Sequence, residues 1–257
     1  MAAKRIRVIY PVYVPEDALM ADVAVQIPKE MIRPGIEVEF MSTRDGATLV
    51  DSYADIELMD MFVFEAGLRA AKEGVDAICI NTTSDSAVNA LRSRLTIPVI
   101  GPGTTCFHMA CLLGHKFSII TMWDRWKLLY KKTLDQEGLW HRVASIRACE
   151  TEPDPQKLLA GKEGEVFPKI EHACRQAIEE DGADVIIIGS TTMHRAHKYL
   201  AERLPVPVLN PGLIAHKMCE MLLELGLSHS KRAYIEPLHP KDDLIFRTLG
   251  SAPGPGK

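Results

Sequence analysis

Two runs of hydroxyl residues, each directly behind a short apolar segment, could carry the chemistry of this chain. They consist of Thr82, Thr83 and Ser84 in the first run and Ser190, Thr191 and Thr192 in the second. If each run opens a helix, Thr82 or Ser190 caps that helix, and the next backbone N–H groups favour an anion. Two opposed runs of this kind could hold a carboxylate or a polarised carbonyl. The alternative is that both are ordinary helix caps.

Asp85 and His194 are the acid–base candidates beside these runs. Asp85 lies three residues after Thr82, and His194 lies four residues after Ser190, so on a helix each shares a face with its hydroxyl residue. Near a helix N-terminus His194 is expected to be neutral, and therefore able to accept a proton. His197 stands three residues further on. Without a defined third ligand this spacing does not predict a metal site.

Tyr10 and Tyr13 stand where the first apolar segment of the chain ends. Ligands of open parallel sheets bind beyond the carboxyl ends of the strands, so both phenols are expected at the rim of the pocket. Tyr10 is a candidate hydrogen-bond donor to the substrate, with a purely structural phenol as the equal alternative.

The two hydroxyl runs occupy equivalent places in an internal repeat. Residues 74–84 return as residues 182–192, 108 positions later, and residues 94–103 return as residues 203–212, 109 positions later. Such a duplication predicts two lobes related by a pseudo-twofold axis. The hydroxyl runs would then face each other across that axis, where we expect the active site.

Short β-branched segments alternate with helical patterns along the whole chain. The predicted strands are 6–10, 37–40, 77–80, 98–100, 117–121, 143–146, 185–188 and 206–209. Residues 53–73 have the spacing of an amphipathic helix that stops at Gly74. The alternation predicts an α/β fold of two pseudo-symmetric, doubly wound parallel-sheet lobes with the site between them. We place the lobes at 1–118 and 119–227, followed by a C-terminal arm and disordered tail at 228–257.

Composition narrows the class of protein. A chain of 257 residues with 47% apolar residues can bury a substantial core. A net charge of −4 gives no footprint for nucleic acid. No apolar run approaches the roughly 20 residues that span a bilayer, and no signal-peptide core follows Met1, so we expect a cytoplasmic protein without a membrane partner. The six cysteines lack metal or disulfide spacing, which predicts reduced and mostly buried thiols.

The repeat, the run from Cys111 to Thr121 and the ending from Leu225 to Arg232 resemble the aspartate/glutamate/hydantoin racemase superfamily. The resemblance covers nearly all of residues 5–240 and is strongest to the hydantoin racemase branch. It implies two pseudo-symmetric α/β lobes, a site between them, no metal or organic cofactor, and a homo-oligomer of at least two subunits. In the racemases one cysteine ends each central strand. One thiolate removes the proton next to the carbonyl, and the opposite thiol returns a proton on the other face.

Both thiols are missing here, because Thr82 and Ser190 stand at the positions that match the two cysteines. A thiol near pKa 8.5 can be tuned into a base by a helix N-terminus, whereas an aliphatic hydroxyl lies many units higher. Two-thiol racemisation is therefore excluded at these positions. Cys106 is the one cysteine within plausible reach of the cleft, and packing in a helix is the favoured interpretation of it.

Three hypotheses follow for a small carboxylate, amide or hydantoin-like substrate. The first is a cofactor-free isomerase or lyase whose enolate-like intermediate is held by the hydroxyl runs, with His194 or Asp85 moving the proton. Arylmalonate decarboxylase, which keeps a hydroxyl-lined anion pocket with one thiol fewer, is the superfamily relative that favours it. The second is an amidohydrolase with Ser190 as nucleophile and His194 as base. The third is a binding protein that retains the pocket without catalysis.

Overall fold

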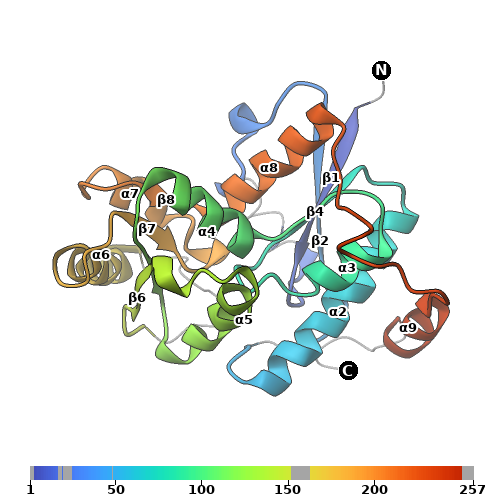
Figure 1. The fold of residues 1–257 in the computed structure, drawn as a ribbon, viewed down its shortest axis with the longest axis horizontal. Coiled ribbons are helices and arrows are strands. Elements are labelled where there is room, and N and C mark those ends of the chain that lie inside the picture. The colour runs from blue at the N-terminus through green and yellow to red at the C-terminus, as the bar shows by residue number, and fades with distance from the viewer. Residues whose placement is uncertain (1–2, 17–18, 20–24, 48, 152–162, 251–257) are drawn as a thin grey trace.

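Two parallel β-sheets, one in each half of the chain, organise the fold (Figure 1). The computed structural model describes residues 3–16, 19, 25–47, 49–151 and 163–250. The first sheet has the order β2-β1-β3-β4, and its strands are β1 (Lys4–Tyr10), β2 (Ile36–Ser42), β3 (Ala77–Ile80) and β4 (Val99–Ile100). The second has the order β6-β5-β7-β8, and its strands are β5 (Phe117–Thr121), β6 (Val143–Ala148), β7 (Val185–Ile188) and β8 (Val208–Leu209).

The two sheets repeat the same topology, and every strand pair in them is parallel. The central strands β3 and β7 are buried along their whole length, as expected for strands covered by helices on both faces. Their last paired residues are Ile80, opposite Ile9, and Ile188, opposite Ile120. The hydroxyl runs therefore start at equivalent sheet edges. The predicted α/β class with two doubly wound lobes is confirmed.

Helices cover both faces of the sheets. They are α2 (Tyr53–Lys72), α3 (Val88–Arg94), α4 (Pro102–Leu113), α5 (Leu128–Glu137), α6 (Glu163–Glu179), α7 (Ala196–Ala201), α8 (Pro211–Leu225) and α9 (Asp242–Leu249). Short 3-10 helices lie at Lys29–Met31, Asp124–Lys127, Trp140–Arg142 and Thr191–Met193. None of the helices in the described part of the chain is long and apolar enough to span a bilayer.

Local sequence signals set the ends of α2. The Ser52 hydroxyl accepts a hydrogen bond from Asp55 N at 3.2 Å, which caps the helix at its start. The helix ends before Gly74, whose φ of 78° lies in the left-handed region that glycine adopts without strain. The predicted helix over 53–73 and its glycine stop are confirmed.

The lobes exchange one helix each. Cys106, Phe107 and Ala110 of α4 pack in one core with the second sheet, and the rings of Phe107 and Phe117 stack 5.6 Å apart. In return Ala215 and Cys219 of α8 pack in the core of the first sheet. Figure 1 shows α8 against the lobe of β1 and α4 against the lobe of β7. The boundaries predicted at 1–118 and 119–227 thus follow the order of the sheets only approximately, since β5 begins at Phe117 and the two covering helices are exchanged.

The predicted C-terminal arm packs on the first lobe of the chain. Lys231 Nζ donates hydrogen bonds to three carbonyl oxygens at the end of α3, at 2.7 to 2.9 Å. Arg94 of α3 donates two bonds to Asp242 of α9, and Lys72 of α2 lies 3.8 Å from the centre of the Phe246 ring. Residues 228–250 therefore pack on the first lobe of the same chain, and the expected homo-oligomer stays a prediction. The predicted tail at 251–257 lies outside the described residues.

His229 gives the docking of the arm a pH dependence. Val99 N donates to His229 Nε2 at 2.9 Å, so this nitrogen must be unprotonated. Burial, reinforced by the charge of Arg92, lowers the pKa of His229 from 6.5 to about 4. Because the unfolded chain takes up the proton first, the stability that His229 contributes is lost as pH falls from 6.5 to about 4.

We expect the thermal midpoint of the wild type to fall more than that of His229→Gln between these two pH values. The glutamine amide oxygen can accept the same hydrogen bond without titrating. Scanning calorimetry of both proteins across the window makes the measurement. Parallel curves for the two proteins would show that His229 does not control the docking of the arm.

Candidate active site

The two hydroxyl runs are joined by reciprocal hydrogen bonds across the lobes. Thr83 Oγ1 donates to Gly189 O at 2.6 Å, and Thr191 Oγ1 donates to Asn81 O at 2.9 Å. Both donors and both acceptors are equivalent positions of the repeat, and both threonines are buried. The two bonds are related by the pseudo-twofold axis and connect the lobes across it. The sequence placed Thr83 and Thr191 among the substrate-binding residues, but their hydroxyls are used to hold the lobes together.

The remaining hydroxyls form two short chains, one from each lobe. Thr82 Oγ1 lies 3.0 Å from Ser84 Oγ, which lies 2.9 Å from Ser86 Oγ. In the other lobe Ser190 Oγ lies 2.8 Å from Thr192 Oγ1. Each hydroxyl carries one hydrogen, so the bonds within a chain leave one hydrogen of that chain for a further acceptor. Both chains begin at a partly exposed residue. Each can therefore donate to an oxygen of a ligand.

The helix caps expected at Thr82 and Ser190 take a different form. The helix α3 begins at Val88, behind Ala87 with a φ of 56°, and α7 begins at Ala196. Ser190 caps only the 3-10 helix Thr191–Met193, where its hydroxyl accepts from Thr192 N at 3.3 Å. The predicted pair of opposed α-helix N-termini is therefore wrong.

A buried amide network supports the first run from behind. Tyr10 donates its phenol hydrogen to Gln26 Oε1 at 2.8 Å, and Gln26 Nε2 donates to Asn81 Oδ1 at 2.8 Å. Gln26 Nε2 also lies 3.5 Å from Thr191 O in the other lobe. The phenol of Tyr10 is thus hydrogen-bonded to Gln26, which agrees with the structural alternative for this residue. Tyr13 remains at the surface, with 43% of its area exposed.

Asp85 connects the first hydroxyl run to the start of α4 through hydrogen bonds. Its carboxylate accepts hydrogen bonds from Gly103 N, Thr104 N and Thr104 Oγ1, each at 2.7 Å. A Cβ added to Gly103 would lie 2.3 Å from Thr83 O, so only glycine permits this approach. Burial raises the pKa of Asp85, against the effect of the three donors. These three bonds indicate a positioning role for the carboxylate, and proton transfer by Asp85 stays a prediction.

His194 is buried behind the second run, with 6% of its area exposed. Its Nδ1 lies 3.0 Å from Thr191 O, a carbonyl that can only accept, so Nδ1 carries the hydrogen in the neutral ring. That tautomer leaves Nε2 as the basic nitrogen. Ser190 Oγ lies 2.8 Å from Thr192 Oγ1, and either hydroxyl can be the donor. The helical i,i+4 spacing assumed for Ser190 and His194 is interrupted by the turn before α7.

The six cysteines are free, and five of them are buried. Burial raises the pKa of the Cys106 thiol well above its ordinary value, and the nearby Asp85 raises it further. Cys106 is completely buried in α4, where it packs among Phe107 and Ile119. The favoured interpretation of Cys106 as a packing residue is confirmed. Among the described residues no group of three His, Cys, Asp or Glu side chains is placed to hold a metal ion.

Sequence reasoning missed Gln26 and Asn81, which position the first run, and Asp60, whose Oδ1 accepts from Ala87 N at 3.1 Å. Asn81 alone had a signal, since it is the residue directly behind a buried strand. Gln26 stands in a long connection and Asp60 on a helix more than twenty residues upstream of the run. Their roles come only from the tertiary fold.

The fold and the joined loops define a two-lobed α/β protein with pseudo-twofold symmetry. The chain belongs to the Asp/Glu/Hydantoin racemase family, whose model matches residues 17–219. It is similar to the hydantoin racemase of a Pseudomonas species, with 29% identity over 208 residues that cover 79% of this chain and 80% of that one. The resemblance inferred from the sequence is thereby confirmed, and the chain is an enzyme of the racemase superfamily.

Two solved structures share the fold over nearly the whole chain. The allantoin racemase from Klebsiella pneumoniae has a TM-score of 0.80 at 28% identity, covering 93% of this chain and 95% of that one. The allantoin racemase from Pseudomonas fluorescens has a TM-score of 0.82 at 27% identity, covering 92% and 98%.

Proposed function

We propose that this chain is a cofactor-independent enzyme that forms an enolate-like intermediate next to a carbonyl of a small hydantoin-like or amino-acid-derived substrate. The observation that carries the proposal is the pair of hydroxyl chains that begin at Thr82 and Ser190, one on each side of the pseudo-twofold axis. Donors aimed at the oxygen where negative charge develops stabilise an enolate more than they stabilise the carbonyl before it. No thiol takes part.

Proton transfer is assigned to His194 in this proposal. The Thr191 carbonyl fixes the tautomer in which Nε2 is basic, and burial keeps water from competing for the proton. Asp85 fits the role less well, because three donors already engage its carboxylate. The relatives that are named hydantoin and allantoin racemases support a ring substrate with an acidic C–H bond beside a carbonyl.

Decarboxylation is the second candidate, and the missing thiols favour it. Loss of carbon dioxide leaves the same enolate without any base to remove a proton, so an anion pocket of hydroxyls is sufficient for that step. The amidohydrolase alternative has less support, because the turn before α7 interrupts the helical i,i+4 spacing on which it relies.

A screen in deuterium oxide separates these reactions. Hydantoins, amino acids and malonates are incubated with the enzyme, and NMR and mass spectrometry follow each compound. Deuterium entering the carbon next to the carbonyl supports proton transfer, and loss of carbon dioxide supports the lyase. Gain of water, or no reaction with any member of the panel, contradicts the proposal.

Thr82→Val and Thr83→Val form a matched pair of the same change at adjacent residues. We expect Thr82→Val to lower kcat by about 10- to 100-fold with little loss of stability, because it removes a donor to the developing enolate. Thr83→Val removes the buried bond to Gly189 O, so it should cost about 1–2 kcal/mol of unfolding free energy. The measurement is kcat together with denaturant unfolding for each variant. If Thr82→Val keeps wild-type kcat and loses only stability, Thr82 is a structural residue.

Alkylation tests the absence of a catalytic thiol. We expect iodoacetamide to leave turnover unchanged over an hour at neutral pH, since Cys106 is buried with a raised pKa and only Cys111 is partly exposed. Mass spectrometry of the treated protein reports which thiols react. Rapid inactivation that substrate prevents would place a cysteine in the site and overturn the thiol-free mechanism.

A further inference from the structure

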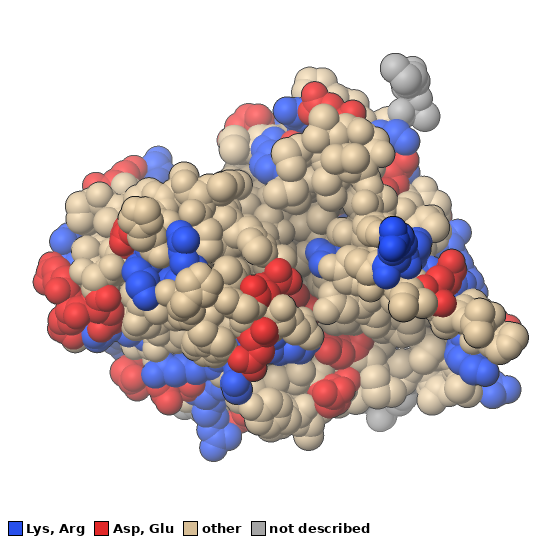
Figure 2. Space-filling model, in the orientation of Figure 1, with Lys and Arg blue, Asp and Glu red and all other residues tan. Residues whose placement is uncertain are grey.

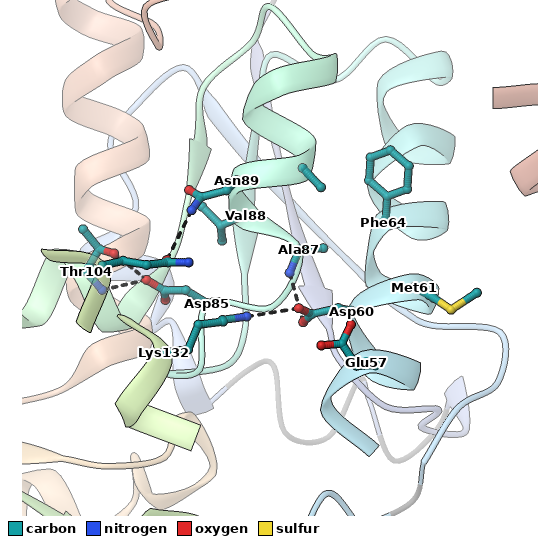
Figure 3. Close-up of a pocket in the computed structure, with 12 residues that line it drawn as sticks. Glu57, Asp60, Met61, Phe64, Asp85, Ala87, Val88, Asn89, Thr104 and Lys132 are labelled. Atoms are coloured by element: carbon teal, nitrogen blue, oxygen red, sulfur yellow. Dashed lines mark hydrogen bonds and ion pairs between the residues drawn. The ribbon is translucent and has the colours of Figure 1, made fainter. Parts of the chain in front are cut away.

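A pocket is lined by residues from both lobes and includes Asp85, the residue directly after the first hydroxyl run (Figure 3). Its volume is about 350 Å³, within the range of small-molecule sites. Neither Thr82 nor Ser190 lines it. The walls come from α2, from the turn before α3 and the start of that helix, from the first turn of α4, and from α5.

One wall of the pocket is a single stripe of α2. Glu57, Asp60, Met61 and Phe64 recur at the three- and four-residue spacing of one helix face and all line the cavity. The thioether and the ring make an apolar patch beside the two carboxylates. In the close-up, Asp60 and Lys132 meet across the pocket, with Met61 and Phe64 on the side away from Asp85 (Figure 3).

The charges of the lining do not balance. Lys132 of α5 reaches Asp60 with Nζ 3.0 Å from Oδ2, which compensates one carboxylate. Glu57 has no ion-pair partner among the described residues, and Asp85 lines the far end. Figure 2 shows acidic side chains gathered around the hollow between α2 and α5. The pocket is therefore acidic, with an aromatic ring and a thioether next to the unpaired carboxylate.

We propose that this pocket binds a small organic ammonium ion. The ammonium group would lie between Glu57 and Asp60, and the apolar part of the ligand would cover Phe64 and Met61. An ammonium ion near two carboxylates gains electrostatic energy, and the ring face of Phe64 attracts a cation as well.

A bound ligand would affect the turn that follows the first hydroxyl run, because Asp60 contacts both the pocket and this turn. Its second oxygen, Oδ1, accepts from Ala87 N at 3.1 Å, and Ala87 has a left-handed φ of 56°. Such a conformation is unfavourable for alanine and persists only where its surroundings hold it. The preceding Ser86 ends the hydroxyl chain that begins at Thr82. A cation that competes with Lys132 for Asp60 therefore contacts the side chain that holds this turn.

Isothermal titration calorimetry of the full chain tests the site with 2-phenylethylammonium chloride as the probe. We expect saturable binding at low ionic strength that is about tenfold tighter than binding of the neutral isostere 2-phenylethanol and weakens with salt. The anion 3-phenylpropanoate should not bind here. Equal affinity for the cation and the alcohol, or no saturable binding of the cation, overturns the proposal.

Glu57→Gln is the decisive variant, because Glu57 is exposed and its change leaves the packing intact. We expect it to weaken the cation about fivefold. Glu137→Gln is the matched control. Like Glu57, Glu137 lies on a helix that forms a wall of the pocket, here α5, but it pairs with His108 and does not line the pocket. Unchanged affinity in Glu57→Gln, or an equal loss in both variants, contradicts the assignment. The readout is binding, so it is independent of whether the proposed reaction is correct.

Discussion

His194→Ala is expected to lower kcat by about two to four orders of magnitude, the range that a positioned general base contributes. The change removes the nitrogen that we assign to proton transfer, and it also removes the hydrogen bond from Nδ1 to Thr191 O. Turnover is measured as deuterium exchange on the substrate that the screen identifies. The thermal midpoint is measured on the same samples, because loss of a buried side chain also lowers stability.

His172→Ala is the matched control for this experiment. His172 is exposed on α6, so its removal should leave both turnover and stability unchanged. His194→Gln separates the two roles of His194, since an amide can bond to the Thr191 carbonyl but cannot act as a base at neutral pH. If His194→Gln keeps full turnover, proton transfer belongs to another group or to bound water. If only the thermal midpoint falls in His194→Ala, the imidazole is a structural residue.

Proton transfer by His194 and decarboxylation predict different results for the same variant. Loss of carbon dioxide needs no base, so a decarboxylase would retain this step in His194→Ala and lose only control over where the new proton arrives. The enantiomeric excess of the product would then fall while the rate of carbon dioxide release stays near that of the wild type. The variant therefore also decides between the two proposed reactions.

The sequence predicts the sheets well because their signals are local. The buried run of β7 is β-branched along its whole length and that of β3 is apolar with two isoleucines, and the repeat fixes which strands are equivalent. Helix α2 has both a capping serine and a terminating glycine, and its predicted ends agree with the structure. Each of these features depends on neighbouring residues only, which is why a single sequence suffices.

The exchange of α4 and α8 has no such local signal. Both helices have apolar faces of ordinary spacing, and nothing in either sequence tells which sheet will cover that face. Contacts such as Cys106 with the second sheet and Cys219 with the first are fixed by the path of the whole chain. The division into two consecutive lobes was therefore the simplest prediction that the repeat allowed.

The loops of the candidate site differ from the prediction for a conformational reason. The sequence shows an apolar strand followed by hydroxyl residues, which usually indicates a helix cap. Here the chain after Thr82 makes a turn through two left-handed residues, Asp85 at φ 51° and Ala87 at φ 56°, before α3 begins. Neither residue is a glycine, so nothing in the sequence marks the turn. Tertiary hydrogen bonds to α4 and α2 hold it instead.

Asp85→Ala is therefore expected to destabilise the fold severely. The change leaves the buried Gly103 N and the partly buried Thr104 N and Thr104 Oγ1 without their acceptor, at about 1–3 kcal/mol for a buried unsatisfied group. Alanine also tolerates the left-handed backbone less well than aspartate does. We expect the unfolding free energy to fall by about 3–5 kcal/mol, which corresponds to roughly 10 °C in the thermal midpoint. Denaturant unfolding and scanning calorimetry give both quantities.

Asp85→Asn distinguishes a structural role of Asp85 from a role in proton transfer, because the change removes the charge but keeps one oxygen that accepts hydrogen bonds. A structural role predicts an intermediate loss of stability. It also predicts a kcat near that of the wild type when kcat is measured well below the thermal midpoint of the variant. A catalytic carboxylate predicts the reverse, with stability near that of the wild type and turnover lost at every temperature. Asp124→Ala is the control, since the Asp124 side chain is 66% exposed and its removal should change stability by no more than about 0.5 kcal/mol. If Asp85→Asn keeps its stability but loses turnover, Asp85 takes part in the reaction, and the reason for assigning proton transfer to His194 alone is removed.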